Sequence, residues 1–180
     1  MTHEEASQFL KPVRISEGEV WADLGAGTGT FTEVLAKSVG QIGRVHAVDR
    51  SKESLEQLSS LTQDFPVTLH HQDFSQDLNL ANLDGILLAN ALHYSRRQKQ
   101  VLSNLMPLLK PAGKLVVLEY DRQVPNPWIP FPVSKQKLVD LTRALKLCAP
   151  IILNERASRY GNGTLYLALI KRTQSSDVLL

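Results

Sequence analysis

The chain has 180 residues, 43% of them hydrophobic, and a formal net charge of +2, which suits one domain with a sizeable core and argues against a nucleic-acid partner. Its one cysteine, Cys148, excludes an intramolecular disulfide, and no spacing of Cys and His residues indicates a metal site. Because no apolar run reaches membrane-spanning length and the first residues do not resemble a signal peptide, we expect a cytoplasmic protein without a membrane partner.

Helices and strands alternate through the first half of the chain. Thr2 can cap a helix that Pro12 ends, and the apolar residues that follow repeat at strand or helix spacing. The predicted elements are a helix over 2–11, a strand over 20–24, a helix from 30 to about 40, a strand over 44–49, a helix after Ser51 with Leu55, Leu58 and Leu61 facing inward, and a short strand over 66–69.

The alternation continues in the second half until a proline-rich segment interrupts it. The predicted elements are a strand over 83–89, a helix over 95–110, a strand over 114–120, a stiff extended loop over 123–132, a helix after Ser134, and strands over 149–154 and 164–171. The last two strands are joined by a turn that contains Gly161 and Gly163. Because this turn has no room for a helix, the two strands should pair antiparallel.

This order of elements predicts an α/β fold, a doubly wound and mostly parallel sheet with helices on both faces. We expect a single domain over residues 2–172 and a loose tail over 173–180. In such sheets, ligands bind outside the carboxyl ends of the strands, at the point where the strand order reverses.

A glycine-rich turn follows the first predicted strand. Gly25, Gly27 and Gly29 lie between that strand and a helix that starts near Thr30. Glycine lets the backbone approach a ligand, and the helix N-terminus offers unpaired N–H groups to a carboxylate or phosphate. A dinucleotide site has the pattern Gly-x-Gly-x-x-Gly, whose third glycine would stand at Thr30, so the spacing disfavours a nicotinamide cofactor. On this motif alone, a tight turn without a ligand remains an alternative.

Polar side chains stand at or just past the ends of four predicted strands: Asp23, Asp49, Asp73 and Asn90. Because parallel strands end at the same edge of a sheet, we expect these side chains to gather there. Asp49 lies 20 residues after Gly29, at the position where an acid accepts the hydroxyls of a ribose. For Asp73 alone, a helix cap or a solvated loop residue is a fair alternative.

These motifs together resemble the class I S-adenosylmethionine-dependent methyltransferases, from about residue 2 to residue 171. The matching segments are residues 23–29 (Asp-Leu-Gly-Ala-Gly-Thr-Gly), 45–49 (Val-His-Ala-Val-Asp), 72–74 (Gln-Asp-Phe), 90–94 (Asn-Ala-Leu-His-Tyr) and 109–119. The resemblance implies a seven-stranded sheet in the order 3-2-1-4-5-7-6, with strand 7 antiparallel. It also implies methyl transfer, with S-adenosyl-L-methionine as the cofactor.

The cofactor-binding residues that the resemblance implies all lie at or directly after the ends of the first four strands. They are Asp23 near the amino group, the backbone of Gly25, Ala26, Gly27 and Gly29 around the methionine part, Asp49 on the ribose with Arg50 beside it, Asp73 and the Phe74 N–H on the adenine, and Asn90 closing the site. No metal ion is expected.

A base helps methyl transfer if the nucleophile arrives protonated. His93 is the candidate, because it follows the fourth strand and because a histidine titrates near neutral pH. A histidine that is only packed against the sheet edge, or exposed, is the alternative reading of this residue. Tyr94, Glu119 and Asp121 are weaker candidates for the base.

The acceptor is not encoded in a motif. The Asn/Asp-Pro-Pro-aromatic motif of family members that methylate exocyclic amines is replaced here by Asn90-Ala-Leu-His, and Trp128 and Phe131 either wall an acceptor pocket or cover the core. We therefore expect transfer to an O, N or S nucleophile of a small molecule. Methylation of a macromolecule and a non-catalytic, cofactor-binding partner subunit are the alternatives. Acceptor recognition would come from short loops, the N-terminal helix or a second subunit, so a homodimer stays open.

Overall fold

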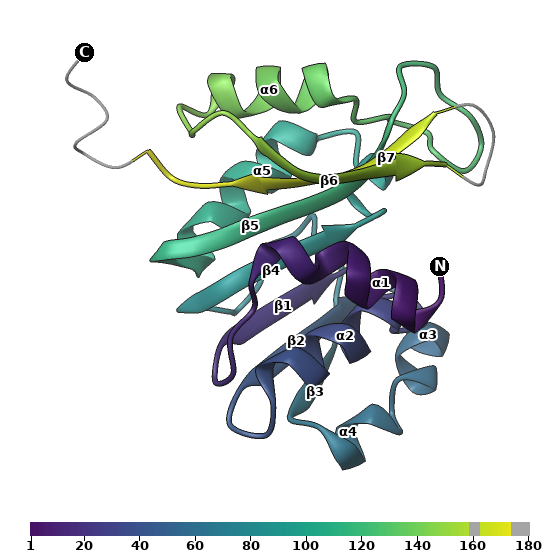
Figure 1. The fold of residues 1–180 in the computed structure, drawn as a ribbon, viewed down its shortest axis with the longest axis vertical. Helices are drawn as coiled ribbons and strands as arrows, with labels where there is room; N and C mark the ends of the chain where they lie inside the picture. The colour runs from purple at the N-terminus through teal and green to yellow at the C-terminus, as the bar shows by residue number, and fades with distance from the viewer. Residues whose placement is uncertain (159–162, 174–180) are drawn as a thin grey trace.

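The alternating elements assemble into one seven-stranded sheet with helices on both faces (Figure 1). The computed structural model describes residues 1–158 and 163–173. The sheet order is β3-β2-β1-β4-β5-β7-β6, formed by β1 (Val20–Leu24), β2 (Arg44–Asp49), β3 (Val67–His71), β4 (Leu83–Ala89), β5 (Leu109–Asp121), β6 (Ile151–Ala157) and β7 (Thr164–Ile170). β1 to β5 pair parallel, whereas β7 pairs antiparallel with both β5 and β6. The predicted fold class, strand order and strand directions are confirmed.

Two hydrophobic clusters pack on opposite faces of the sheet. The helices are α1 (His3–Leu10), α2 (Thr30–Val39), α3 (Lys52–Gln57), α4 (Leu61–Asp64), α5 (Gln98–Leu105) and α6 (Lys135–Ala144), with short 3-10 turns η1 (Lys11–Val13), η2 (Leu92–Tyr94) and η3 (Met106–Leu108). Buried residues of α1, α2 and α3 pack on one face, and buried residues of α5 and α6 pack on the other. This packing fixes the sheet and therefore the loops at its carboxyl edge.

The first helix forms as its sequence predicts. Thr2 Oγ1 accepts a hydrogen bond from Glu5 N at 3.2 Å, and Glu5 Oε2 accepts one from Thr2 N at 3.1 Å. This reciprocal pair satisfies N–H groups that have no partner within the helix. Pro12 then confines the chain to a single 3-10 turn before β1.

The predicted helix over 95–110 and strand over 114–120 had the wrong bounds. α5 spans only Gln98–Leu105, because Pro107 lacks an N–H and the chain tightens into η3 before it reaches Leu109. β5 then begins at Leu109 and pairs with Leu83, and the register shifts before Gly85 meets Lys114. An irregular pairing of this kind leaves no periodicity in the sequence.

Three smaller predictions also need correction. The helix after Ser51 divides into α3 and α4, and Leu61 begins the second of them. β3 extends to His71, because that residue pairs with Asp49. β6 starts at Ile151 and runs to Ala157, later than the predicted strand over 149–154.

The proline-rich segment is not uniformly extended. Asn126 and Ile129 pair as an isolated antiparallel bridge, and Asn126 Oδ1 accepts hydrogen bonds from Trp128 N and Ile129 N. The segment therefore contains a tight turn at its centre.

The expected domain bounds, 2–172, stay a prediction. Gly161 of the predicted turn and residues 174–180 of the predicted tail lie outside the described residues. Within the described part of the chain, we find no helix with the length and apolar character needed to cross a bilayer.

Candidate functional site

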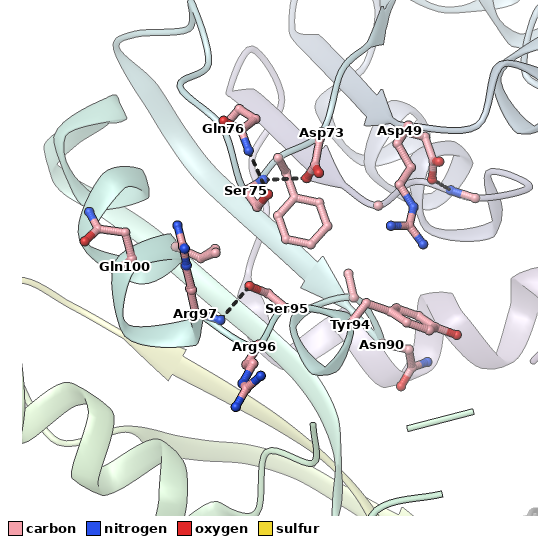
Figure 2. A pocket seen from close by; sticks show the side chains of 16 residues that line it. Asp49, Asp73, Ser75, Gln76, Asn90, Tyr94, Ser95, Arg96, Arg97 and Gln100 are labelled. Atoms are coloured by element: carbon pink, nitrogen blue, oxygen red, sulfur yellow. Dashed lines mark hydrogen bonds between the residues drawn. The ribbon is translucent and has the colours of Figure 1, made fainter. Parts of the chain in front are cut away.

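The carboxyl ends of the central strands meet around a cavity of about 700 Å³ (Figure 2). Its walls come from the loops after β1 to β4 and from the start of α5, where the strand order reverses between β1 and β4. The predicted cofactor-binding residues in this lining are Gly25, Gly27, Asp49, Arg50, Asp73, Phe74 and Asn90. A smaller cavity of about 240 Å³ is lined in part by Asp23, Ala26 and Gly27. Both cavities share Gly25, Gly27 and Asn90, so they adjoin at the glycine loop.

The glycine loop is hydrogen-bonded to the end of β2 and packs closely against Leu58, the residue after α3. The N–H groups of Gly25 and Ala26 both donate to Val48 O, at 2.8 and 3.1 Å. Gly29 has a φ of +88°, and a Cβ atom there would overlap Leu58 Cδ2. Glycine adopts this positive φ without strain and leaves room for the Leu58 side chain. Gly29 therefore shapes the loop rather than lining a cavity.

Gly27 differs, because it faces open space. Its φ is +53°, and an added Cβ would meet nothing nearer than Gly25 O at 4.0 Å. The Gly27 N–H donates to Asp49 Oδ2 at 2.8 Å, while Asp49 Oδ1 accepts from Ser51 N at 2.8 Å. A carboxylate has about four lone-pair sites, so Asp49 keeps the capacity to accept hydroxyl groups from the cavity.

Asp23 lies at the base of the smaller cavity and is 1% exposed. Burial raises the pKa of Asp23 to about 6, the Thr32 hydroxyl that donates to Oδ2 at 2.7 Å opposes this rise, and the charge of Asp49 adds to it. A buried carboxylate of this kind is stabilised by a cationic group placed against it. The position suits an ammonium group.

Asp73 and Phe74 follow β3 and face the larger cavity. Asp73 Oδ1 accepts a hydrogen bond from Ser75 N at 2.8 Å, which is a local turn contact and not a helix cap, because no helix follows in the described residues between β3 and β4. Phe74 also packs against the hydrophobic cluster under α5, so its ring is held in place beside the cavity. The structure thus gives Asp73 a local structural role at the same time as a position in the lining.

Asn90 combines an unusual backbone with an unpaired side-chain atom. Its φ is +52°, and its N–H donates to Leu118 O at 2.8 Å, which fixes the residue at the end of β4. Its Oδ1 is buried and has no hydrogen-bond partner among the described residues. Because a buried acceptor without a donor is costly, this atom points to a donor supplied by a ligand.

His93 is buried beneath the cavity wall and is paired with Glu119. The His93 ring is bonded through Nδ1 to Glu119 Oε2 at 2.7 Å, and His93 N donates to Glu119 Oε1 at 3.1 Å. The two residues are 2% and 0% exposed. His93 is absent from the lining of both cavities, although Tyr94 beside it lines the larger one. The sequence raised both residues as bases but did not show that they form a pair.

Sequence reasoning did not single out the far end of the larger cavity. This end is formed after β3 and at the start of α5 by Ser75, Gln76, Ser95, Arg96, Arg97 and Gln100 (Figure 2), and Ala91 and Val101 also line the cavity. No motif connects these residues, because two separate segments supply them. The sequence offered one indication of this end of the cavity. The loops after β3 and β4 both follow strands that end at the same edge of the sheet, so they could be expected to lie near each other.

The sequence left two roles open for Trp128 and Phe131 in the proline-rich segment, either to wall an acceptor pocket or to cover the core. Trp128 is 77% exposed, so the interpretation that it covers the core is wrong. It is also absent from the lining of the two cavities. Phe131 is half-buried, and its N–H donates to His93 O at 3.0 Å. This bond holds the proline-rich segment against the segment after β4, which forms part of the cavity wall.

Comparison with known sequences places the chain among methyltransferases. A family model described as a methyltransferase domain matches residues 15–171. The chain is 34% identical over 117 residues to an uncharacterized 37.1 kDa protein of a Streptomyces fradiae transposon, across 64% of this chain and 34% of that protein. It is 29% identical over 134 residues to a demethylmenaquinone methyltransferase of Lactobacillus johnsonii, across 68% and 52%. The chain therefore spans about a third to a half of the length of these relatives.

The fold is also shared with solved structures. A 1,6-didemethyltoxoflavin-N1-methyltransferase of Burkholderia thailandensis, solved with 1,6-didemethyltoxoflavin and S-adenosylhomocysteine, matches with a TM-score of 0.75 and 22% identity, across 95% of this chain and 78% of that one. At this identity, the likeness concerns the fold alone. Together with the family model and the sheet order, it leads to one conclusion: the chain belongs to the methyltransferase domain family and has the class I S-adenosylmethionine-dependent methyltransferase fold.

Proposed function

We propose that this chain transfers a methyl group from S-adenosylmethionine to a small-molecule acceptor. The observation that carries the proposal is the arrangement of Asp49 and Gly27, where an open glycine backbone and a carboxylate with spare acceptor capacity face the same cavity. The buried, unpartnered Asn90 Oδ1 supports it, because a ligand with N–H or O–H donors satisfies that atom. The residues present therefore fit the cofactor.

The two adjoining cavities divide the work of holding the cofactor. Asp49, Asp73 and Phe74 line the larger cavity, where Asp49 would accept the ribose hydroxyls and the Asp73–Phe74 segment would hold the adenine. Asp23 lines the smaller cavity and would hold the amino group. The bound cofactor supplies an electrophilic methyl group on its sulfonium sulfur. The protein contributes by fixing the acceptor in line with that methyl group and by excluding water.

His93 is the proposed proton acceptor. Its bond to Glu119 through Nδ1 favours the neutral tautomer in which Nδ1 carries the proton, and this leaves the Nε2 lone pair free to accept one. Glu119 acts on the reaction only through the ring that it orients. Since His93 lies beneath the wall, this role requires the acceptor to reach past Asn90 and Tyr94.

The names of two relatives favour a second candidate for the acceptor atom. Both the Lactobacillus johnsonii protein, a demethylmenaquinone methyltransferase, and a Psychromonas ingrahamii protein, a ubiquinone/menaquinone C-methyltransferase, are named for quinones. A ring carbon of a reduced quinone is nucleophilic once its hydroxyl loses a proton, which is a task for a neighbouring base. Transfer to such a carbon therefore stands beside transfer to O, N or S. Cytoplasmic location and a homodimer stay predictions.

The test is a turnover assay with methyl-labelled S-adenosylmethionine and a panel of small acceptors that starts with reduced demethylmenaquinone. We expect S-adenosylhomocysteine to form only when an acceptor is present, and Asp49→Ala to lower the rate at limiting cofactor. Binding of S-adenosylhomocysteine without turnover on small molecules, but with turnover on a protein extract, supports the macromolecular alternative. Binding without any turnover supports a non-catalytic partner subunit.

A further inference from the structure

The loop between β5 and α6 carries an exposed apolar tip. Trp128 is 77% exposed and Val124 is 70% exposed, and both lie in this loop. Figure 1 shows the loop beyond the strand ends, on the side of the sheet where the N-terminus also lies. This side holds the mouth of the larger cavity, because the loops after β1 to β4 line that cavity.

The tip is held rigidly rather than left to fold over the core. Asn126 Oδ1 accepts from Trp128 N at 2.9 Å and from Ile129 N at 2.6 Å, and Ile129 anchors the turn with only 7% of its surface exposed. The four prolines between residues 125 and 132 restrict the backbone further. Because the backbone of this turn is already ordered, it loses little conformational entropy when the Trp128 side chain enters an apolar environment.

The stretch of chain that contains this tip carries more cations than acids. Between residues 90 and 137, the acids are Glu119, which is buried against His93, and Asp121, which pairs with Lys135 at 3.3 Å. In the same stretch, the cations that form no ion pair within the described residues are Arg96, Arg97, Lys99, Arg122 and Lys137. The stretch from 90 to 137 therefore combines the apolar tip with unpaired positive charge, whereas the acids of the carboxyl edge, Asp49 and Asp73, lie in the cavity lining, and the whole chain carries only +2.

We propose that this face docks reversibly on an anionic lipid bilayer, with Trp128 and Val124 at the level of the headgroups. Tryptophan favours the boundary between headgroups and acyl chains, and flanking cations are attracted to anionic lipids. The aliphatic Val124 favours a bilayer over a nucleic acid, whose bases stack on aromatic rings instead. Surface docking of this kind needs no spanning helix, and it does not depend on the proposed methyl transfer.

The two tryptophans make the docking measurable in the full chain. Trp21 is fully buried and Trp128 is exposed, so a change in exposure on docking is confined to Trp128. With vesicles of phosphatidylglycerol and phosphatidylcholine at low salt, we expect the emission to shift to shorter wavelength and acrylamide quenching to fall. Pure phosphatidylcholine vesicles should give a much smaller change, and 0.5 M NaCl should release the protein, because the cationic contribution is screened.

Matched variants distinguish docking through this loop from nonspecific adsorption of the protein to the vesicles. Sedimentation with the anionic vesicles should fall at least fivefold in Trp128→Ser/Val124→Ser and in Lys99→Gln/Arg122→Gln. It should be unchanged in Ile42→Ser, whose side chain is also 77% exposed but lies between α2 and β2, at the amino ends of the strands. Retained binding of S-adenosylhomocysteine, or failing that a native melting curve, verifies each fold.

Three results overturn the proposal. The first is equal sedimentation of the tip variant and the parent protein, and the second is an equal loss in Ile42→Ser. The third is a Trp128 shift with single-stranded polyuridylate but none with anionic vesicles, which indicates a nucleic-acid surface.

Discussion

The carboxylate of Asp49, at the end of β2, accepts a hydrogen bond from the N–H of Gly27, in the loop after β1, at 2.8 Å. This bond joins two residues of the cavity lining that come from different strand ends. It also means that a change at either position alters the other, so their effects should not be additive.

Asp49→Ala should weaken binding of S-adenosylhomocysteine. The variant loses charge-assisted bonds to the ribose and the partner of the Gly27 N–H, and we expect a cost of about 1.5–3 kcal/mol, or roughly 10–150-fold in affinity. Calorimetric titration measures this. Asp140→Ala, which removes an exposed acid from α6, is the matched control and should bind normally. Unchanged affinity in a folded Asp49→Ala protein removes Asp49 from the site.

An added side chain should have different effects at two glycines of the loop, mainly on cofactor binding at one and mainly on stability at the other. Gly27→Val places its side chain in the open space before the cavity, so cofactor binding should be lost, with a strain cost of about 1–3 kcal/mol at its positive φ. Gly29→Ala drives a methyl group into Leu58, so it should lower the melting temperature more than Gly27→Val does. Thermal melts with and without S-adenosylhomocysteine distinguish the two. Normal binding by Gly27→Val shows that the loop is only a turn.

Binding should weaken as the pH falls through the titration of Asp23. With its pKa raised to about 6, Asp23 is ionised at pH 7.5 and largely protonated at pH 5, where it no longer attracts the ammonium of S-adenosylhomocysteine. Asp23→Asn should bind more weakly at pH 7.5 and show a flatter pH profile. Equal slopes for the variant and the parent protein contradict this role.

The stability of the free protein should change with pH in the opposite direction, and its contribution from Asp23 should decrease as the pH rises. A pKa that is raised by folding contributes stability that is complete below the unfolded value of 3.8 and is lost as the pH rises through about 6. Asp23→Asn should therefore stabilise the free protein at pH 8 relative to pH 4, by at most about 3 kcal/mol. Melting temperatures of the variant and the parent protein at the two pH values check this, and a difference between them that is the same at pH 4 and pH 8 contradicts it.

Trp128→Ala should leave the fold intact. Because the side chain is exposed, we expect a change in the free energy of unfolding within about 0.5 kcal/mol, whereas Trp21→Ala should cost about 3–5 kcal/mol. Chemical denaturation of both variants provides the comparison. A large loss in Trp128→Ala means that the side chain packs against the core in solution.

The His93–Glu119 pair should separate chemistry from cofactor binding. If His93 accepts the proton, His93→Gln lowers kcat by about 10²–10⁴-fold while the affinity for S-adenosylhomocysteine changes less than about twofold. His3→Gln, at an exposed histidine that pairs with Glu33, serves as the control. A folded His93→Gln protein with parental kcat leaves the pair with a structural role only. Glu119→Ala leaves the backbone and ring N–H groups of His93 without an acceptor and should cost about 1–3 kcal/mol of stability for each in either case.

The parts of the fold that were predictable from the sequence are those with local signals. β1, β2 and β4 have their predicted bounds because each is a short apolar run with turn residues at its ends, and the glycine loop places α2 at Thr30 as expected. The end of α5 and the start of β5 were missed, because the shift between Leu83 and Gly85 arises from pairing between distant segments. Acids at strand ends were sufficient to place the cavity.

Side-chain partners were beyond reach, because they depend on three-dimensional packing. The bond from Gly27 to Asp49 crosses 22 positions, and the contact between His93 and Glu119 crosses 26. The exposure of Trp128 follows from the Asn126 turn, whose two backbone bonds leave no periodic trace. Burial, and hence the raised pKa of Asp23, likewise requires the packed sheet.

Calorimetric titration of the full chain with S-adenosylhomocysteine, and in parallel with NAD, tests the central claim most directly. The site described here predicts one saturable binding event per chain with S-adenosylhomocysteine, weakened at least tenfold by Asp49→Ala, and no heat of binding with NAD. Saturable binding of NAD, or no binding of S-adenosylhomocysteine by a folded chain, would contradict it.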